Sequence, residues 1–283
     1  MRVELVSIDT ETIPLDGAWY EPENGPIRGA VLIMHGNQGN FYVGPPRFLP
    51  PALTEVGFAS LAFNRRGHDI LATCRSREPV GGAFQTTQEQ VEDNEAAAAW
   101  LRARGFPSPA VVGHSHGGLL AARYAAAHPE TPALTLLSAA GGGRDATRIN
   151  SAAGLLLGDR YDEIVERARR LGAEGHGREL IHLPGWWWVI SAASLCDRLD
   201  QLPDLVAEAP AIRCPTLFLK GQGEPEAAYP SRAFSAACSG PCDVVELPGR
   251  DHWYNGCERE VSTAVVEWLA RVMTVPSTSP PLR

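Results

Sequence analysis

The stretch from residue 110 to residue 127 constrains the fold most, because it places a serine between two closely spaced glycines. A short apolar run, Ala110 to Val112, leads into Gly113-His-Ser115-His-Gly117, and an alanine-rich helical pattern follows at once. This order predicts a strand, a sharp turn with Ser115 at its apex, and a helix. Larger residues at the two glycine positions would collide with such a strained turn. The motif also arises by chance, so its chemical partners must be sought elsewhere in the chain.

Apolar runs and helical patterns alternate along most of the chain, which predicts a mostly parallel sheet with helices on both faces. The fold class is therefore α/β, with eight strands expected in the sheet. The predicted strands cover about residues 3–9, 17–21, 29–36, 58–63, 110–112, 134–138, 215–221 and 243–249. The predicted helices cover about 46–56, 86–104, the stretch after Ser115, 229–238 and 257–272.

The alternation is interrupted over residues 141–210, which have helical periodicity and no convincing strand. We interpret this stretch as a helical cap inserted after the sixth strand, above the carboxyl ends of the strands. The core then comprises residues 1–140 and 211–275, and residues 276–283 form a flexible tail.

A serine hydroxyl needs a base to remove its proton, and the base needs an acid to orient it. His252 follows the last predicted strand, which is where the order serine, acid, histidine places the base. His114 and His116 flank Ser115 and cannot easily turn back onto it, so they line the pocket or pack beneath it. His35 ends a strand and is interpreted as structural.

The acid should follow the strand that ends at Gly221. Glu224 stands three residues beyond that glycine and is the first choice. Glu226 and Asp145 remain alternatives. Asp251 is interpreted as a loop anchor, because its side chain should diverge from that of the adjacent His252.

Acyl transfer develops negative charge on the substrate oxygen, and two backbone amides usually bind that oxyanion. One should be the amide of His116, directly after the nucleophile. The other should be that of Asn37, in the loop after the strand ending at His35-Gly36, with Gln38 as second choice.

Substrate-binding residues are predicted from their position. Gln38 and His114 adjoin the expected oxyanion loop and nucleophile. Trp186, Trp187 and Trp188 cannot all face one side of a helix, so they form either an apolar substrate wall or the packing of the cap. Arg65 and Arg66 either bind an anionic substrate group or form salt bridges between loops.

Composition restricts the partners. The net charge of −8 argues against nucleic acid and anionic membranes. No apolar run has the length of a membrane span, and the N-terminus lacks the apolar core of a signal peptide. The six cysteines have no spacing suited to a metal site. Cys238 and Cys242 could pair in an oxidising compartment, but reduced thiols in a cytoplasmic protein are the prediction. Exposed tryptophans would favour a homodimer.

The chain resembles the α/β-hydrolase superfamily over about residues 1–272, through Gly-His-Ser-His-Gly-Gly and His-Gly-Asn-Gln-Gly-Asn. The front half, through Phe63-Asn-Arg-Arg-Gly-His-Asp69, looks most like the branch of siderophore-type fungal esterases called DUF1749. The resemblance implies a carboxylic-ester hydrolase that needs no cofactor. Glu224 departs from the aspartate that the superfamily usually has at the acid position.

We therefore predict a serine hydrolase that cleaves a small carboxylic ester or lactone, with an apolar or aromatic part, through an acyl-enzyme on Ser115. Three other functions use the same scaffold. An acyltransferase or thioesterase would pass the acyl group to something other than water. A lyase or isomerase would use Ser115 and His252 for proton transfer, and a ligand receptor would keep the pocket without turnover.

Overall fold

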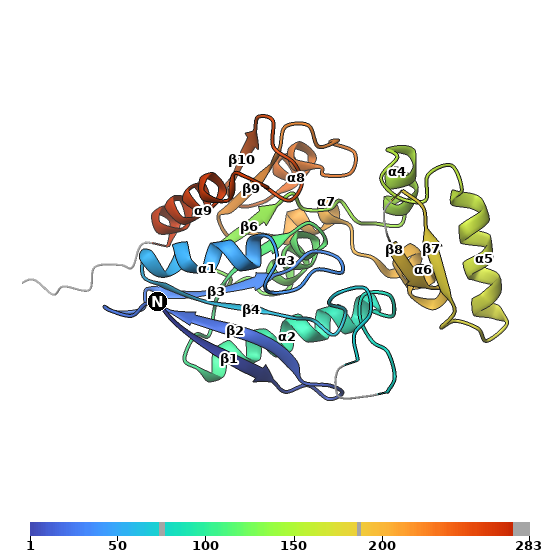
Figure 1. Ribbon diagram of the computed structural model, residues 1–283. Helices are drawn as coiled ribbons and strands as arrows, with labels where there is room; N and C mark the ends of the chain where they lie inside the picture. Colours follow the sequence, from blue (N-terminus) through green and yellow to red (C-terminus); the bar gives the residue numbers. More distant parts are fainter. Residues whose placement is uncertain (74–76, 186–187, 274–283) are drawn as a thin grey trace, which may run out of the picture.

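The computed structural model describes residues 1–73, 77–185 and 188–273. Its centre is an eight-stranded sheet with the strand order β1-β2-β4-β3-β5-β6-β9-β10 (Figure 1). Only β2 runs against its two neighbours, and the remaining pairs are parallel. The strands are β1 (Arg2–Ile8), β2 (Leu15–Glu21), β3 (Gly29–Met34), β4 (Phe58–Phe63), β5 (Ala110–His114), β6 (Leu134–Leu137), β9 (Thr216–Gly221) and β10 (Cys242–Leu247).

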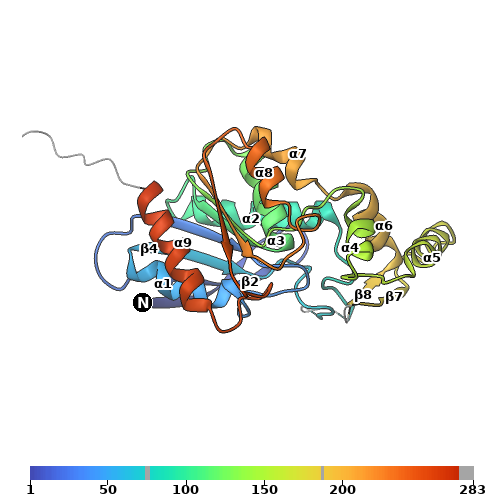
Figure 2. The same cartoon turned by 90° about the horizontal axis from the view of Figure 1, so that it is seen from above.

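Helices cover both faces of the sheet, as Figure 2 shows from above. On one face lie α1 (Pro45–Glu55) and α9 (Glu258–Val272). On the other lie α2 (Thr87–Ala103), α3 (His116–Ala127), the short α7 (Leu205–Glu208) and α8 (Ser231–Ala237). The predicted α/β fold class is confirmed, with a predominantly parallel sheet between two helical layers.

Strand β3 shows why a central strand of this sheet is apolar at every position. Its alternate side chains Ala30, Leu32 and Met34 pack into the layer of α2 and α3, whereas Val31 and Ile33 pack into the layer of α1 and α9. Because successive side chains of a strand point to opposite faces, a strand covered on both sides must be apolar at every position.

The segment between β6 and β9 projects beyond one end of the sheet (Figure 1). It contains α4 (Ala146–Ala152), α5 (Tyr161–Ala173), β7 (Leu180–Leu183), β8 (Trp188–Ser191) and α6 (Ala192–Gln201). We call residues 146–201 the inserted segment. It has an apolar cluster of its own, which includes Ile164, Leu171, Ile181 and Leu195.

The expectation that this stretch holds no strand was wrong, because β7 and β8 form an antiparallel hairpin. In β7 only Ile181 and Leu183 are buried, and their neighbours Leu180 and His182 are exposed. Four residues are too few for such an alternation to stand out in the sequence. Helix α6 starts at Ala192, and the Oγ of Ser191 accepts the backbone N–H of Ser194 to cap it.

Within the described ranges, no helix is both long enough and apolar enough to span a bilayer. Trp186, Trp187 and the tail 276–283 lie outside the described residues, so the expectations for them remain predictions.

Candidate active site

Ser115 occupies the turn between β5 and α3 with φ 56° and ψ −122°, a conformation that side chains rarely adopt. The flanking glycines make this turn possible. A Cβ on Gly113 would lie 2.2 Å from the carbonyl oxygen of Gly117, and a Cβ on Gly117 would lie 2.3 Å from the carbonyl oxygen of His35. The strained turn places the half-buried Ser115 at the end of β5, where it lines a cavity.

His252 and Glu224 lie in hydrogen-bond contact, with 2.6 Å between Nδ1 of the imidazole and Oε1 of the carboxylate. The second carboxylate oxygen of Glu224 accepts hydrogen bonds from the Ser138 hydroxyl at 2.6 Å and the Gly221 amide at 2.7 Å. Glu224 is buried and fixed by these donors. A carboxylate at Nδ1 holds the proton of a neutral imidazole on that nitrogen, so Nε2 carries the lone pair.

The other acidic residues considered for this position have different partners. Glu226 accepts a hydrogen bond from Lys220 at 2.7 Å, which lowers the pKa of its carboxyl even though burial raises it. Asp145 is the exposed residue before α4 in chain order. Asp251 accepts the amides of Trp253 and Asn255, which makes it the loop anchor that the sequence suggested.

His114 was predicted to bind substrate, and the structure places it elsewhere. It is buried beneath His252, with its ring 4.9 Å from the His252 ring and its Nε2 2.8 Å from the His252 carbonyl oxygen. Burial, and then the charge of His252, lower the pKa of His114 to about 3. The neutral ring donates from Nε2 and so fixes the backbone that carries His252, rather than facing the cavity.

His35 and Arg65 brace the loop that follows β3. The backbone amide of Arg65 donates to Nε2 of His35 at 3.1 Å, and the Arg65 guanidinium donates to the His35 carbonyl oxygen at 2.6 Å. Both side chains are buried, and burial holds the pKa of His35 well below its ordinary value. Arg66 instead pairs with the buried Asp93. Both arginines therefore hold loops in place.

The backbone amides of Asn37 and His116 donate to no other group in the part of the chain that the structure describes. Asn37 is held by its side chain, whose Oδ1 accepts a hydrogen bond from Gln85 at 3.1 Å. Gln38 donates from its side chain to the Val189 carbonyl oxygen at 3.1 Å. Gln38 thus ties this loop to the inserted segment. Asn37 and His116, which carry the two unpaired amides, both line the space at Ser115.

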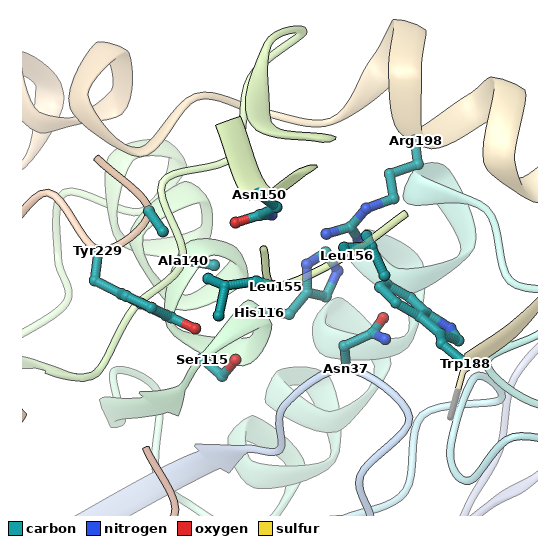
Figure 3. A pocket seen from close by; sticks show the side chains of 11 residues that line it. Asn37, Ser115, His116, Ala140, Asn150, Leu155, Leu156, Trp188, Arg198 and Tyr229 are labelled. Atoms are coloured by element: carbon teal, nitrogen blue, oxygen red, sulfur yellow. The ribbon is translucent and has the colours of Figure 1, made fainter. Parts of the chain in front are cut away.

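A small cavity opens beside Ser115. Residues from the sheet loops and from the inserted segment line it together (Figure 3); they include Asn37, His116, Trp188, Arg198 and Tyr229. The ring of Tyr229 lies 5.0 Å from that of His252, which places His252 next to the cavity. In Figure 3 the Tyr229 hydroxyl points toward Ser115, and burial raises the pKa of that hydroxyl.

Sequence reasoning missed Tyr229 and Arg198, because neither belongs to a motif and only the tertiary fold brings them to the cavity. Of the three predicted tryptophans, Trp188 lines the cavity and is itself buried. No cluster of His, Cys, Asp and Glu among the described residues has the arrangement of a metal site.

The model of the Alpha/beta hydrolase family matches residues 30–264 of the chain. No curated protein matches in a direct sequence comparison. The resemblance of the front half to siderophore-type esterases stays a prediction.

Solved structures show the same fold at low sequence identity. Est1E from Butyrivibrio proteoclasticus, solved with bound ferulic acid, is 21% identical with a TM-score of 0.74, covering 95% of this chain and 99% of its own. The esterase domain of a Rhodothermus marinus protein is 20% identical with a TM-score of 0.67, covering 97% and 100%. A soluble variant of the Saccharomyces cerevisiae monoglyceride lipase, in complex with a substrate analogue, is 17% identical with a TM-score of 0.69, covering 96% of both chains.

Proposed function

The chain belongs to the α/β-hydrolase family, and from that premise we propose that it is a serine hydrolase that cleaves a carboxylic ester or lactone. Ser115 is the nucleophile, His252 the general base and Glu224 the acid that orients it. The backbone amides of Asn37 and His116 form the oxyanion hole.

In the first half of the reaction, Nε2 of His252 takes the Ser115 proton while Oγ attacks the ester carbonyl carbon. The carbonyl oxygen becomes an oxyanion and accepts hydrogen bonds from the two amides. Glu224 stabilises the imidazolium that forms. The tetrahedral intermediate then collapses: the bond to the alcohol oxygen breaks, and His252 returns its proton to that oxygen.

In the second half, His252 removes a proton from water, and the resulting hydroxide attacks the acyl-enzyme carbonyl. The bond to Ser115 breaks and Oγ recovers the proton, which leaves the acid as product. Because Glu224 keeps the imidazole in one tautomer throughout, the same nitrogen serves both halves of the reaction.

The 2.6 Å contact between Glu224 and His252 carries the proposal. It would orient His252 as a base in a loop beside the cavity. The strained backbone of Ser115 fits the turn that carries such a nucleophile. The walls formed by Trp188, Leu155 and Leu156 favour a substrate with an apolar or aromatic part. Est1E, which was solved with an aromatic acid bound, is a precedent for such a ligand on this fold.

The test is covalent labelling with a serine-reactive fluorophosphonate, followed by hydrolysis of a panel of short ethyl and aryl esters. The native protein should be labelled once and should hydrolyse at least one ester. The Ser115→Ala protein should lose both properties. Ser7→Ala, which changes an exposed serine on β1, is the matched control and should retain both. Ester hydrolysis by Ser115→Ala at the native rate would refute the mechanism.

A further inference from the structure

Arg198 stands out among the residues around Ser115. It comes from α6 of the inserted segment, and its side chain reaches down into the cavity toward His116 (Figure 3). Two smaller hollows adjoin the cavity, one toward Gly142 and one toward Thr87, and Arg198 lines both of them as well. Arg198 therefore lies where the open spaces beside Ser115 meet.

The guanidinium of Arg198 has no carboxylate partner and no hydrogen bond among the described residues. Its Nε is buried and unpaired. Its Cζ lies over the face of the Trp188 ring, 5.0 Å from the ring centroid. A cation–π contact does not occupy the N–H groups as hydrogen-bond donors to a carboxylate would, so they remain available to a ligand.

The buried Arg65 also has unpaired guanidinium nitrogens, but it donates from Nη2 to the carbonyl oxygen of His35. Several other arginines form salt bridges. On the neighbouring helix, Arg169 forms a salt bridge with Asp200, and in the core Arg66 forms one with Asp93. Arg198 is half-buried, and keeping a cation out of water without an anion is unfavourable. Such a group needs a partner that arrives later or a strong structural reason. Burial lowers the pKa of Arg198 to about 10, so the group remains charged at neutral pH.

The rest of the cavity wall does not compensate this charge. Among the residues that the structure describes, Arg198 is the only Asp, Glu, Lys or Arg that lines the cavity beside Ser115. Asp197 lines the hollow toward Thr87, where its carboxylate accepts the amide and hydroxyl of Thr87. His116 also borders it, and burial followed by the charge of Arg198 holds the pKa of that imidazole well below its ordinary value. His116 is therefore neutral, and the described wall carries one positive charge inside a protein whose net charge is −8.

We propose that Arg198 binds a carboxylate in the acyl part of the substrate, so that the enzyme prefers monoesters of dicarboxylic acids. This inference rests on the proposed function. His252 protonates the departing alcohol, so the alcohol lies on the side of His252 and Tyr229. In Figure 3 Arg198 and Trp188 lie on the other side of Ser115 from Tyr229, where the acyl part then extends.

The planar fork of a guanidinium suits a carboxylate, because two N–H groups can donate to its two oxygens. Leu155, Leu156 and Trp188 supply apolar contacts for the hydrocarbon between the carboxylate and the ester carbonyl. Arg198 thus acts in substrate choice, whereas Ser115 and His252 carry the reaction.

The test compares esters that differ only by a terminal carboxylate in place of a methyl group. One pair is monoethyl adipate and ethyl hexanoate, and a shorter pair is monoethyl succinate and ethyl butanoate. The measured quantity is the ratio of the two kcat/KM values within each pair. The native protein should favour the carboxylate in at least one pair, and Arg198→Met should lower that ratio about tenfold to a hundredfold.

Arg198→Lys keeps the charge and loses the fork, so its ratio should fall between those of the native protein and Arg198→Met. Arg167→Met is the matched control, because Arg167 lies on the exposed side of α5 in the same inserted segment. Arg167→Met removes the same charge outside the cavity, and its ratio should equal the native one. If Arg198→Met does not fold, the Arg198→Lys ratio decides. A ratio unaltered by the Arg198 substitution, or preference for the neutral ester in both pairs, would overturn the inference.

Calorimetric titration of the Ser115→Ala protein with the same monoesters separates this inference from the proposed function. If the native protein cleaves no ester but the carboxylate ester binds and Arg198→Met abolishes binding, the anion site stands and the hydrolase proposal falls. If the monoesters bind equally with and without Arg198, or do not bind at all, the anion site falls.

Discussion

The turn at Ser115 and the inserted segment that faces it are held in place by different means. Around Ser115 the backbone is packed against backbone, and glycines stand where a single Cβ would meet a carbonyl oxygen. The inserted segment is instead held by its own apolar cluster and a few polar ties to the core, such as Asp197 accepting the amide and hydroxyl of Thr87. The first region tolerates almost no change, whereas the second can vary and so can set substrate choice.

The largest effect on activity should come from the contact between Glu224 and His252. Glu224→Gln puts a neutral amide where a carboxylate is needed. The change disturbs the tautomer of His252 and removes the negative charge that stabilises the protonated imidazole. We expect kcat/KM for any ester substrate to fall by about 10²–10⁴ with little change in KM.

Glu226→Gln is the matched control for that substitution, because Glu226 is two residues away and pairs with Lys220. Its kcat should stay within about threefold of the native value. Equal losses in the two variants would show that Glu224 has no particular role.

A glycine substitution in the turn at Ser115 should destabilise the protein, unlike a glycine substitution in the inserted segment. Gly117→Ala would bring its Cβ 2.3 Å from the His35 carbonyl oxygen, so we expect a loss of about 3 kcal/mol or more in the free energy of unfolding, measured in urea. A Gly117→Ala protein as stable as the native one would show that the turn is not as tightly packed as described.

Lowering the pH should reduce the stability of the folded protein, because buried histidines lie around Ser115. Burial lowers the pKa values of His35, His114 and His116 in the folded state. Below about pH 6.5 the unfolded chain binds protons that the folded protein does not, so stability decreases as the pH falls. At pH 5 each of these histidines should cost about 2 kcal/mol relative to pH 8.

Urea unfolding from pH 8 to pH 5 measures this dependence. The free energy of unfolding should fall between pH 8 and pH 5, and His114→Gln should reduce this fall by the contribution of one histidine. Substitution of the exposed His176 in the inserted segment should leave the fall unchanged. Identical slopes in the two variants would contradict the assignment.

The smallest effect belongs to the inserted segment. Gly172 lies within α5, and a Cβ there would meet no atom within 4 Å. Gly172→Ala should therefore stabilise the protein by about 0.5–1 kcal/mol through helix propensity. Circular dichroism during thermal unfolding would detect the shift, and a destabilised variant would mean that α5 packs more tightly than described.

The same contrast explains what could be predicted from sequence. Gly113, Ser115 and Gly117 are local, and their spacing predicted the turn because sterics alone dictate it. Chain order then pointed to Glu224 and His252, which the structure brings into contact. Alternating apolar runs predicted the sheet, since strands covered on both faces cannot be polar.

The positions set by tertiary packing could not be read in the same way. The adjacency of His114 to Ser115 suggested a role at the cavity, but the strand turns its ring beneath His252. The β7–β8 hairpin has strands of four residues each, too short for a period-two pattern. Arg198 lies in a helix with no motif, and only the approach of α6 to His116 reveals that its charge is unpaired.

Intact-mass and peptide mass spectrometry after rapid mixing with an activated ester tests the central claim most directly. A p-nitrophenyl ester should release a burst of nitrophenol stoichiometric with enzyme, and the quenched protein should carry one acyl group on the peptide that contains Ser115. Turnover without any acylated protein, or acylation confined to another residue, would contradict a mechanism in which Ser115 is the nucleophile.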